Sequence, residues 1–84
     1  MAVRVNISIV CSFYTAGYRG GACEVEEGST ILEALAGLLE QNGVTFKGNI
    51  EDVTICMCNS KQAHYSDVVN EGDGIFIARK IFGG

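Results

Sequence analysis

The sequence predicts an α+β fold in which one main helix packs on a small mixed sheet. The chain has 84 residues, 48% of them hydrophobic and 19% charged, which is typical of a single folded domain with one core. Residues 30–42 repeat apolar side chains at helical spacing, whereas the first and last apolar stretches alternate with the period of a strand. A single helix between two apolar terminal strands favours a two-layer roll with those strands at the centre of the sheet.

The first strand is predicted by apolar residues at every second position, which would place one face on the core. These residues are Val3, Val5, Ile7 and Ile9. Residues 11–21 mix aromatic residues with glycines and are interpreted as a loop, which leads into a second strand near residues 22–26. Glu27-Gly28 then turns the chain.

The helix begins with a capping signal, because Thr30 and Glu33 have the spacing of a capping box. Apolar residues then recur on one side, which predicts one buried face. They are Ile31, Leu32, Leu35, Leu38 and Leu39. Asn42-Gly43 predicts a left-handed stop. Gly37, inside the helix, costs about 0.5–1 kcal/mol relative to alanine and is interpreted as allowing the close approach of a neighbour.

Residues 44–52 are expected to form an irregular connection, and the β-rich run 53–58 a strand. Its alternation divides it between two faces. We expect Val53, Ile55 and Met57 to pack against the helix and Thr54, Cys56 and Cys58 to lie on the outer face. Residues 59–62 are interpreted as a turn, followed by His64 and Tyr65 in a short strand or loop.

A last strand, Ile75 to Ile81, follows the strong turn signal of residues 70–74. With Ile75 and Ile77 facing the core, Phe76 and Ala78 would face outward beside Cys56 and Cys58. The outer face of the sheet would then be partly apolar and open to a partner, which makes Phe76 a candidate partner-binding residue.

Charge and targeting signals narrow the classes of partner. The net charge is −4, which disfavours nucleic acid and favours a basic protein surface. The negative charge is concentrated mid-chain, at Glu24, Glu26, Glu27, Glu33, Glu40, Glu51 and Asp52. No apolar run approaches the ~18 residues of a membrane span, and no signal-peptide pattern is present. We therefore expect a cytoplasmic protein without a membrane partner, whose four cysteines are thiols.

The final residues, Ile81-Phe82-Gly83-Gly84, are interpreted as the working part of the chain. Glycine tolerates almost any backbone conformation, so Gly83-Gly84 can form a thin extended segment with a carboxylate at its tip. At ~3.3–3.6 Å per extended residue, residues 81–84 would project roughly 13–14 Å, enough to reach the active site of another protein. The alternative is a frayed terminus without function.

The order of elements, the Asn70-Glu71-Gly72-Asp73-Gly74 turn and the Ile81-Phe82-Gly83-Gly84 ending together resemble the ThiS/MoaD family of ubiquitin-like sulfur carriers. The resemblance covers nearly the whole chain and is most specific from Gly72 to Gly84. It implies one ubiquitin-like β-grasp domain over residues 1–84, with a flexible tail at residues 81–84.

The same resemblance implies a function. Gly84 would be adenylated by an ATP-dependent partner and converted to a thiocarboxylate, and a synthase subunit would accept the sulfur in molybdopterin or thiamine biosynthesis. The chain would be a carrier and not an enzyme, with no bound cofactor. ATP and the sulfur donor would be used through the partner, since the sequence has no Gly-x4-Gly-Lys-Ser/Thr phosphate loop. Partner contacts would come from Gly83, Phe82, Ile81, Lys80, Arg79 and Phe76.

Alternatives remain at several residues. Cys56 and Cys58 could bind a metal, but strand cysteines two apart are poor chelators, so we expect no metal site and ordinary thiols. His64 lies near Ser66 and Asp67, but a small domain offers little pocket for a catalytic triad. For the whole chain, the alternatives are a ubiquitin-like protein modifier using the same Gly84 chemistry and an interaction module whose tail is incidental.

Overall fold

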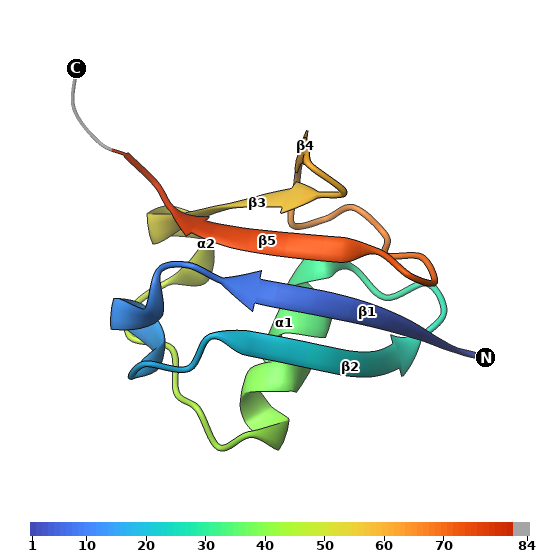
Figure 1. The fold of residues 1–84 in the computed structure, drawn as a ribbon, viewed down its shortest axis with the longest axis horizontal. Coiled ribbons are helices and arrows are strands. Elements are labelled where there is room, and N and C mark those ends of the chain that lie inside the picture. The colour runs from blue at the N-terminus through green and yellow to red at the C-terminus, as the bar shows by residue number, and fades with distance from the viewer. Residues whose placement is uncertain (82–84) are drawn as a thin grey trace.

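The computed structural model describes residues 1–81, which form a five-stranded mixed sheet crossed on one face by a helix (Figure 1). The strands are β1 (Ala2–Ile9), β2 (Gly20–Glu26), β3 (Thr54–Cys58), β4 (Lys61–Ala63) and β5 (Gly74–Arg79). The helices are η1 (Ser12–Thr15, a 3₁₀ helix), α1 (Ile31–Gln41) and α2 (Ile50–Val53). The predicted α+β class is confirmed.

The strand order is β2-β1-β5-β3-β4, so the first and last strands are neighbours inside the sheet. β1 and β5 run parallel, and the remaining pairs are antiparallel. Figure 1 shows β1 and β5 side by side, pointing the same way. The prediction that the terminal strands form the centre of the sheet is confirmed. Because β1 and β5 are parallel, the chain leaves β5 at the same end of the sheet as η1.

The core lies between the sheet and α1. Alternate residues of β1 and β5 are buried, which confirms the predicted inward faces of both strands. They meet the apolar side of α1, and the central buried side chains are Val5, Ile7, Ile9, Ile75, Ile77, Ile31, Ala34, Leu35, Leu38 and Leu39.

Helix α1 begins and ends where the sequence predicts. The Thr30 side chain accepts a hydrogen bond from the Glu33 backbone N–H, and the Glu33 carboxylate accepts one from the Thr30 N–H, so the capping box is complete. Gly43 follows the helix with φ +66°, the left-handed stop. The interpretation of Gly37 is wrong, because a Cβ at this position would meet no atom of a neighbouring element within 4 Å.

The predicted faces of β3 are reversed. Thr54 and Cys56 are buried at 2% exposure each, whereas Ile55 on the alternate face is 43% exposed. The pairing with β5 explains the reversal, since Cys56 is opposite Ile77 on the inner face and Met57 is opposite Phe76 on the outer face. A shift of one residue exchanges every side chain of a strand between the two faces.

Other segments also differ from the sequence predictions. The predicted loop 11–21 contains η1, and the expected irregular connection ends in α2. The turn at 59–62 is shorter than expected, because only Asn59-Ser60 turn, with positive φ at both, before β4 pairs with β3. The second strand begins at Gly20, where a Cβ would collide with the carbonyl of Ile7, so the strands can approach closely there only with glycine.

Candidate functional site

The tail leaves the domain from the end of β5. The Lys80 backbone N–H donates to the carbonyl of Val53 at 2.8 Å, and its Nζ lies 3.4 Å from the carbonyl oxygen of Glu51. Ile81 is then 92% exposed. The predicted site residues Phe82, Gly83 and Gly84 lie outside the described residues. The tail root, which we define as Arg79, Lys80 and Ile81, therefore lies at one end of the central strand (Figure 1).

An aromatic surface flanks the tail root and was not predicted from the sequence. Phe13 of η1 is 71% exposed, and the Lys47 ammonium lies over its ring at 4.9 Å from the centroid. Tyr14 stacks on Phe46 with centroids 5.4 Å apart. A hollow of about 330 Å³ separates this surface from Arg79. The signal that could have found it was the pair Phe13-Tyr14 in a polar loop.

The outer face of the sheet carries a second exposed surface, the apolar patch, which we define as Ile55, Met57, Phe76 and Ala78. Cross-strand pairing joins Met57 to Phe76 and Ile55 to Ala78 on adjacent strands. Phe76 is 42% exposed, so its predicted outward position is confirmed. Its predicted neighbours are wrong, because Ile55 and Met57, and not Cys56 and Cys58, lie on the outer face beside Phe76 and Ala78.

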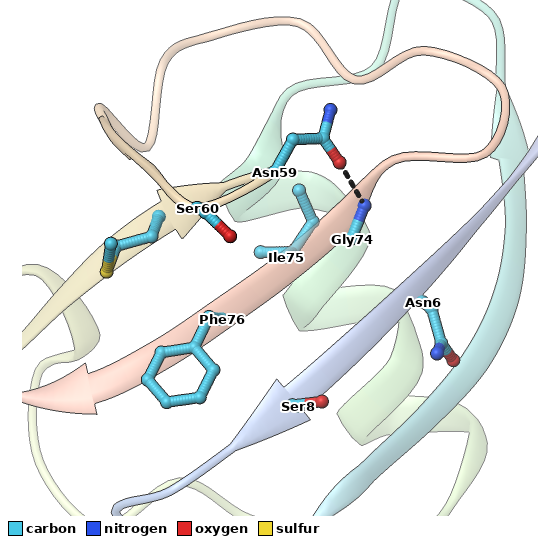
Figure 2. A pocket seen from close by; sticks show the side chains of 8 residues that line it. Asn6, Ser8, Asn59, Ser60, Gly74, Ile75 and Phe76 are labelled. Atoms are coloured by element: carbon cyan, nitrogen blue, oxygen red, sulfur yellow. Dashed lines mark hydrogen bonds between the residues drawn. The ribbon is translucent and has the colours of Figure 1, made fainter.

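A hollow of about 420 Å³ opens beside Phe76 on this face. Figure 2 shows polar side chains around it, with Asn6 and Ser8 from β1 and Asn59 and Ser60 from the β3–β4 turn. An apolar floor with a polar margin is typical of a surface that receives a side chain from a partner protein.

The margin of this hollow is fixed by a buried carboxylate. Asp73 accepts hydrogen bonds from Asn59 Nδ2 at 2.9 Å and from the Asn70 backbone N–H at 2.8 Å. Asn59 Oδ1 in turn accepts from the Gly74 N–H at 2.9 Å (Figure 2). Burial raises the pKa of Asp73, but the hydrogen bonds from Asn70, Asn59 and Cys58 outweigh it and lower the pKa below its ordinary value. The ionised Asp73 thus ties the β3–β4 turn to the start of β5.

The cysteines are free, and Cys11, Cys23 and Cys56 are buried while Cys58 is half-buried. Burial raises the pKa of all four thiols, with the charge of Asp73 adding to the rise at Cys58. They therefore stay protonated at neutral pH, which disfavours thiolate chemistry. Within residues 1–81, no group of three or more His, Cys, Asp or Glu side chains could hold a metal ion.

The cluster around His64 has a structural role in a turn. The Asp67 carboxylate accepts from the His64 backbone N–H at 3.0 Å, and the Asp67 N–H donates to the His64 carbonyl. This carboxylate bond goes to the His64 backbone, not to its ring, so it provides no triad-type orientation of the imidazole. Among the described residues, no helix is long and apolar enough to cross a membrane.

No protein-family model and no curated protein matches the chain. Several solved structures do match the chain in fold. One is SAMP1 from Haloferax volcanii, with TM-score 0.65 and 22% identity over 96% of this chain and 99% of that chain. A second structure, of H. volcanii small archaeal modifier protein 1, has TM-score 0.66 and 20% identity over 94% and 99%. The chain has the ubiquitin-like β-grasp fold.

A ubiquitin from Caldiarchaeum subterraneum shares this β-grasp fold along its full length, with TM-score 0.61, 13% identity and 100% of both chains covered. The predicted ubiquitin-like β-grasp is therefore confirmed. The narrower resemblance to the ThiS/MoaD family stays a prediction, since identities of 13–22% establish the fold alone.

Proposed function

We propose that this protein is a sulfur carrier whose Gly84 is adenylated and then thiocarboxylated by a partner enzyme. The observation that supports it most is the geometry of the tail root. The central strand β5 ends in a backbone bond from Lys80 to Val53, and the next residue, Ile81, is 92% exposed. The strand thus places Ile81, the first residue of the Ile-Phe-Gly-Gly ending, at one end of the sheet.

The proposed chemistry needs only a carboxylate from this chain. A carboxylate oxygen of Gly84 attacks the α-phosphorus of ATP, and pyrophosphate leaves. A sulfur nucleophile, hydrosulfide in the simplest case, then attacks the acyl carbon, and AMP leaves with the bonding electrons to its oxygen. The product is a thiocarboxylate. ATP binding and sulfur delivery fall to the adenylating enzyme, so the chain is a cosubstrate and not an enzyme.

The apolar patch is the proposed docking surface for that enzyme and for the synthase subunit that accepts the sulfur. Phe76 supplies an exposed aromatic anchor, and Ile55 beside it is exposed to a similar degree, 43% against 42%. Aromatic side chains at the centre of an interface commonly carry much of its binding energy. Arg79 and Lys80 add positive charge between the patch and the tail, which favours an acidic rim on the partner.

A second candidate function is that of a protein modifier, in which a lysine amine of a target protein attacks the same acyl-adenylate. The names of the two Haloferax structures, which are modifier proteins, favour it. The two candidates share the first step and differ in the nucleophile. For either we expect a cytoplasmic protein, and for the carrier a role in molybdopterin or thiamine biosynthesis.

Intact mass spectrometry tests the proposal. The protein is incubated with ATP, the adenylating enzyme of its host and a sulfur donor, beside a variant lacking Gly84 and a control variant Glu27→Gln. A mass gain that matches replacement of one oxygen by sulfur, present in Glu27→Gln and absent without Gly84, is the expected result. Isopeptide-linked conjugates without the thiocarboxylate would favour the modifier. If neither product forms, both candidate functions are refuted, and the chain is an interaction module with an incidental tail.

A further inference from the structure

The free edge of β2 offers a second place for a partner. β2 ends the sheet in the order β2-β1-β5-β3-β4 and pairs only with β1 among the described strands. It runs for seven residues, whereas β4 at the opposite edge has three. An exposed edge strand presents unpaired N–H and C=O groups that can pair with another extended chain.

The hydrogen-bonding register shows which groups face outward. At the two ends of the pair, Ile9 N–H donates to the Arg19 carbonyl and Glu27 N–H donates to the Met1 carbonyl. In an antiparallel pair the residues that bond to the partner alternate with residues that point away from it. The residues numbered 19, 21, 23, 25 and 27 therefore bond to β1, and Ala22, Glu24 and Glu26 direct their backbone groups to the free edge.

Nearly all the outward backbone N–H and C=O groups of these three residues are available for pairing. Ala22 and Glu24 each present an N–H and a C=O, and Glu26 presents an N–H while its carbonyl accepts from the Ser29 N–H at 3.0 Å. A hollow of about 310 Å³ lies along this segment, lined by Ala22, Cys23 and Glu24, with Arg4 and Gln41 also at its wall. The edge is thus accessible over the length of a short added strand.

The charge along this edge distinguishes between two occupants, a second copy of this chain and an extended segment of another protein. Glu24, Glu26 and Glu27 are exposed at or beside the edge, whereas Arg4 lies opposite Glu24 on β1 and Arg19 precedes the strand at its other end. A second copy pairing antiparallel at this edge would bring the carboxylates of both chains to one seam, and the register centred on Glu24 would set Glu24 directly against Glu24. An extended segment with basic side chains at alternate positions would meet the opposite charge.

We propose that the β2 edge binds an extended basic segment of a partner protein, which adds a sixth strand beside Ala22 and Glu24. The inference does not depend on the proposed function of the tail. β2 lies two strands from β5, about 10 Å across the sheet at the usual strand spacing. A partner at this edge would leave both the apolar patch and the tail root free.

The probe is the peptide acetyl-Lys-Val-Lys-Val-Lys-Val-Lys-amide, titrated into the ¹⁵N-labelled full chain at low salt. We expect amide shifts and slowed hydrogen exchange at Ala22, Glu24 and Glu26. Shifts centred on Phe76 and the rest of the apolar patch would instead overturn the proposal. So would the same edge shifts appearing with protein concentration in the absence of peptide, because the occupant would then be a second copy.

Two variants, a control variant and a modified peptide separate the contribution of strand pairing from that of charge. Ala22→Pro removes an outward N–H and no bond to β1, so the fold is kept while binding falls at least about tenfold. Glu24→Lys weakens binding, whereas Asp52→Lys, the same charge change on α2, has little effect. The peptide N-methylated at alternate residues tests pairing without altering the protein. Equal binding of both peptides, or of Ala22→Pro and the parent chain, would overturn the proposal.

Discussion

Replacing Thr54 by valine tests the buried contact that supports β3 and, through it, the tail root. Thr54 is 2% exposed, and its hydroxyl donates to the Ile50 carbonyl. A hydroxyl has one proton to give, so the Tyr65 hydroxyl must donate to Thr54 Oγ1. Valine keeps the shape but leaves the Tyr65 hydroxyl without this acceptor, while the Ile50 carbonyl still accepts from the Thr54 N–H.

The expected cost follows from these contacts. Thr54→Val loses one hydrogen bond to a carbonyl that keeps another donor, about 1 kcal/mol, and leaves the hydroxyl of the half-buried Tyr65 without its acceptor, about 1–3 kcal/mol. The sum of about 2–4 kcal/mol is a large part of the stability of a domain of this size. Adding Tyr65→Phe removes the stranded hydroxyl, so the double variant should recover about 1–2 kcal/mol relative to Thr54→Val.

Urea unfolding of the parent chain, both single variants and the double variant provides the measurement, with the midpoint read at constant m-value. A cost of Thr54→Val below about 0.5 kcal/mol would refute the reasoning. The reasoning would also be refuted if the double variant lost the sum of the unfolding free energies lost by the two single variants, because the two hydroxyls would then not depend on each other.

The same contact predicts a response to high pH. Burial raises the pKa of Tyr65 to about 12, against an ordinary value of 10.0, although the bond to Thr54 lowers it. The folded state favours the neutral phenol, so this contribution is fully present below about pH 10 and is lost as the pH rises towards 12. The free energy of unfolding of Tyr65→Phe should therefore fall less over this range than that of the parent chain.

Three further predictions concern the outer face. Phe76→Ser should weaken binding to the adenylating enzyme at least about tenfold, measured by calorimetry, with an unchanged circular dichroism spectrum; unchanged affinity would remove the apolar patch from the interface. Asp73→Asn should cost about 1–3 kcal/mol at pH 7 in urea unfolding. Because the pKa of Asp73 is lowered, its contribution is present above about pH 4 and disappears in more acidic solution, so the difference from the parent should narrow there. Ser60→Gly should be neutral or stabilising by up to about 1 kcal/mol, since Ser60 has φ +70°. Asn59→Gly should destabilise the protein, because it loses the hydrogen bonds to Asp73 and Gly74. Thermal melts that rank the two variants in the reverse order would contradict the assigned turn.

The reversal of β3 shows where sequence reasoning fails. Two alternate sets of residues each contain side chains that a core accepts, and hydrophobicity alone favours the more apolar set, with Ile55 and Met57, for the interior. The structure buries Thr54 and Cys56 instead. The polar group of Thr54 is paired by Ile50 and Tyr65, so burial does not leave it unsatisfied. Both partners lie outside the strand, and the pattern within 53–58 holds no information about them.

The candidate site, like the fold, could be predicted from the sequence only in part. Sequence reasoning predicted the outward position of Phe76 from a local pattern, whereas the role of the Gly-Gly ending stays a prediction. Sequence reasoning missed Ile55 and Met57 as neighbours of Phe76. It also missed the contact of Lys47 with the Phe13 ring and the hydrogen bond between Asn59 and Asp73. These join residues that are distant in the sequence, and their approach depends on the pairing of β3 with β5 and on the position of η1.

By itself, then, the sequence determined the α+β class, the limits of helix α1, the inward faces of β1 and β5, and the Gly-Gly ending. Each follows from hydrogen bonding, capping or periodicity within a few residues. Only the tertiary structure decided the places of β2, β3 and β4 around the two central strands, the face of β3 and the free edge at β2. Strand pairing joins segments that are far apart in the chain, and a single residue of register exchanges the two faces of a strand.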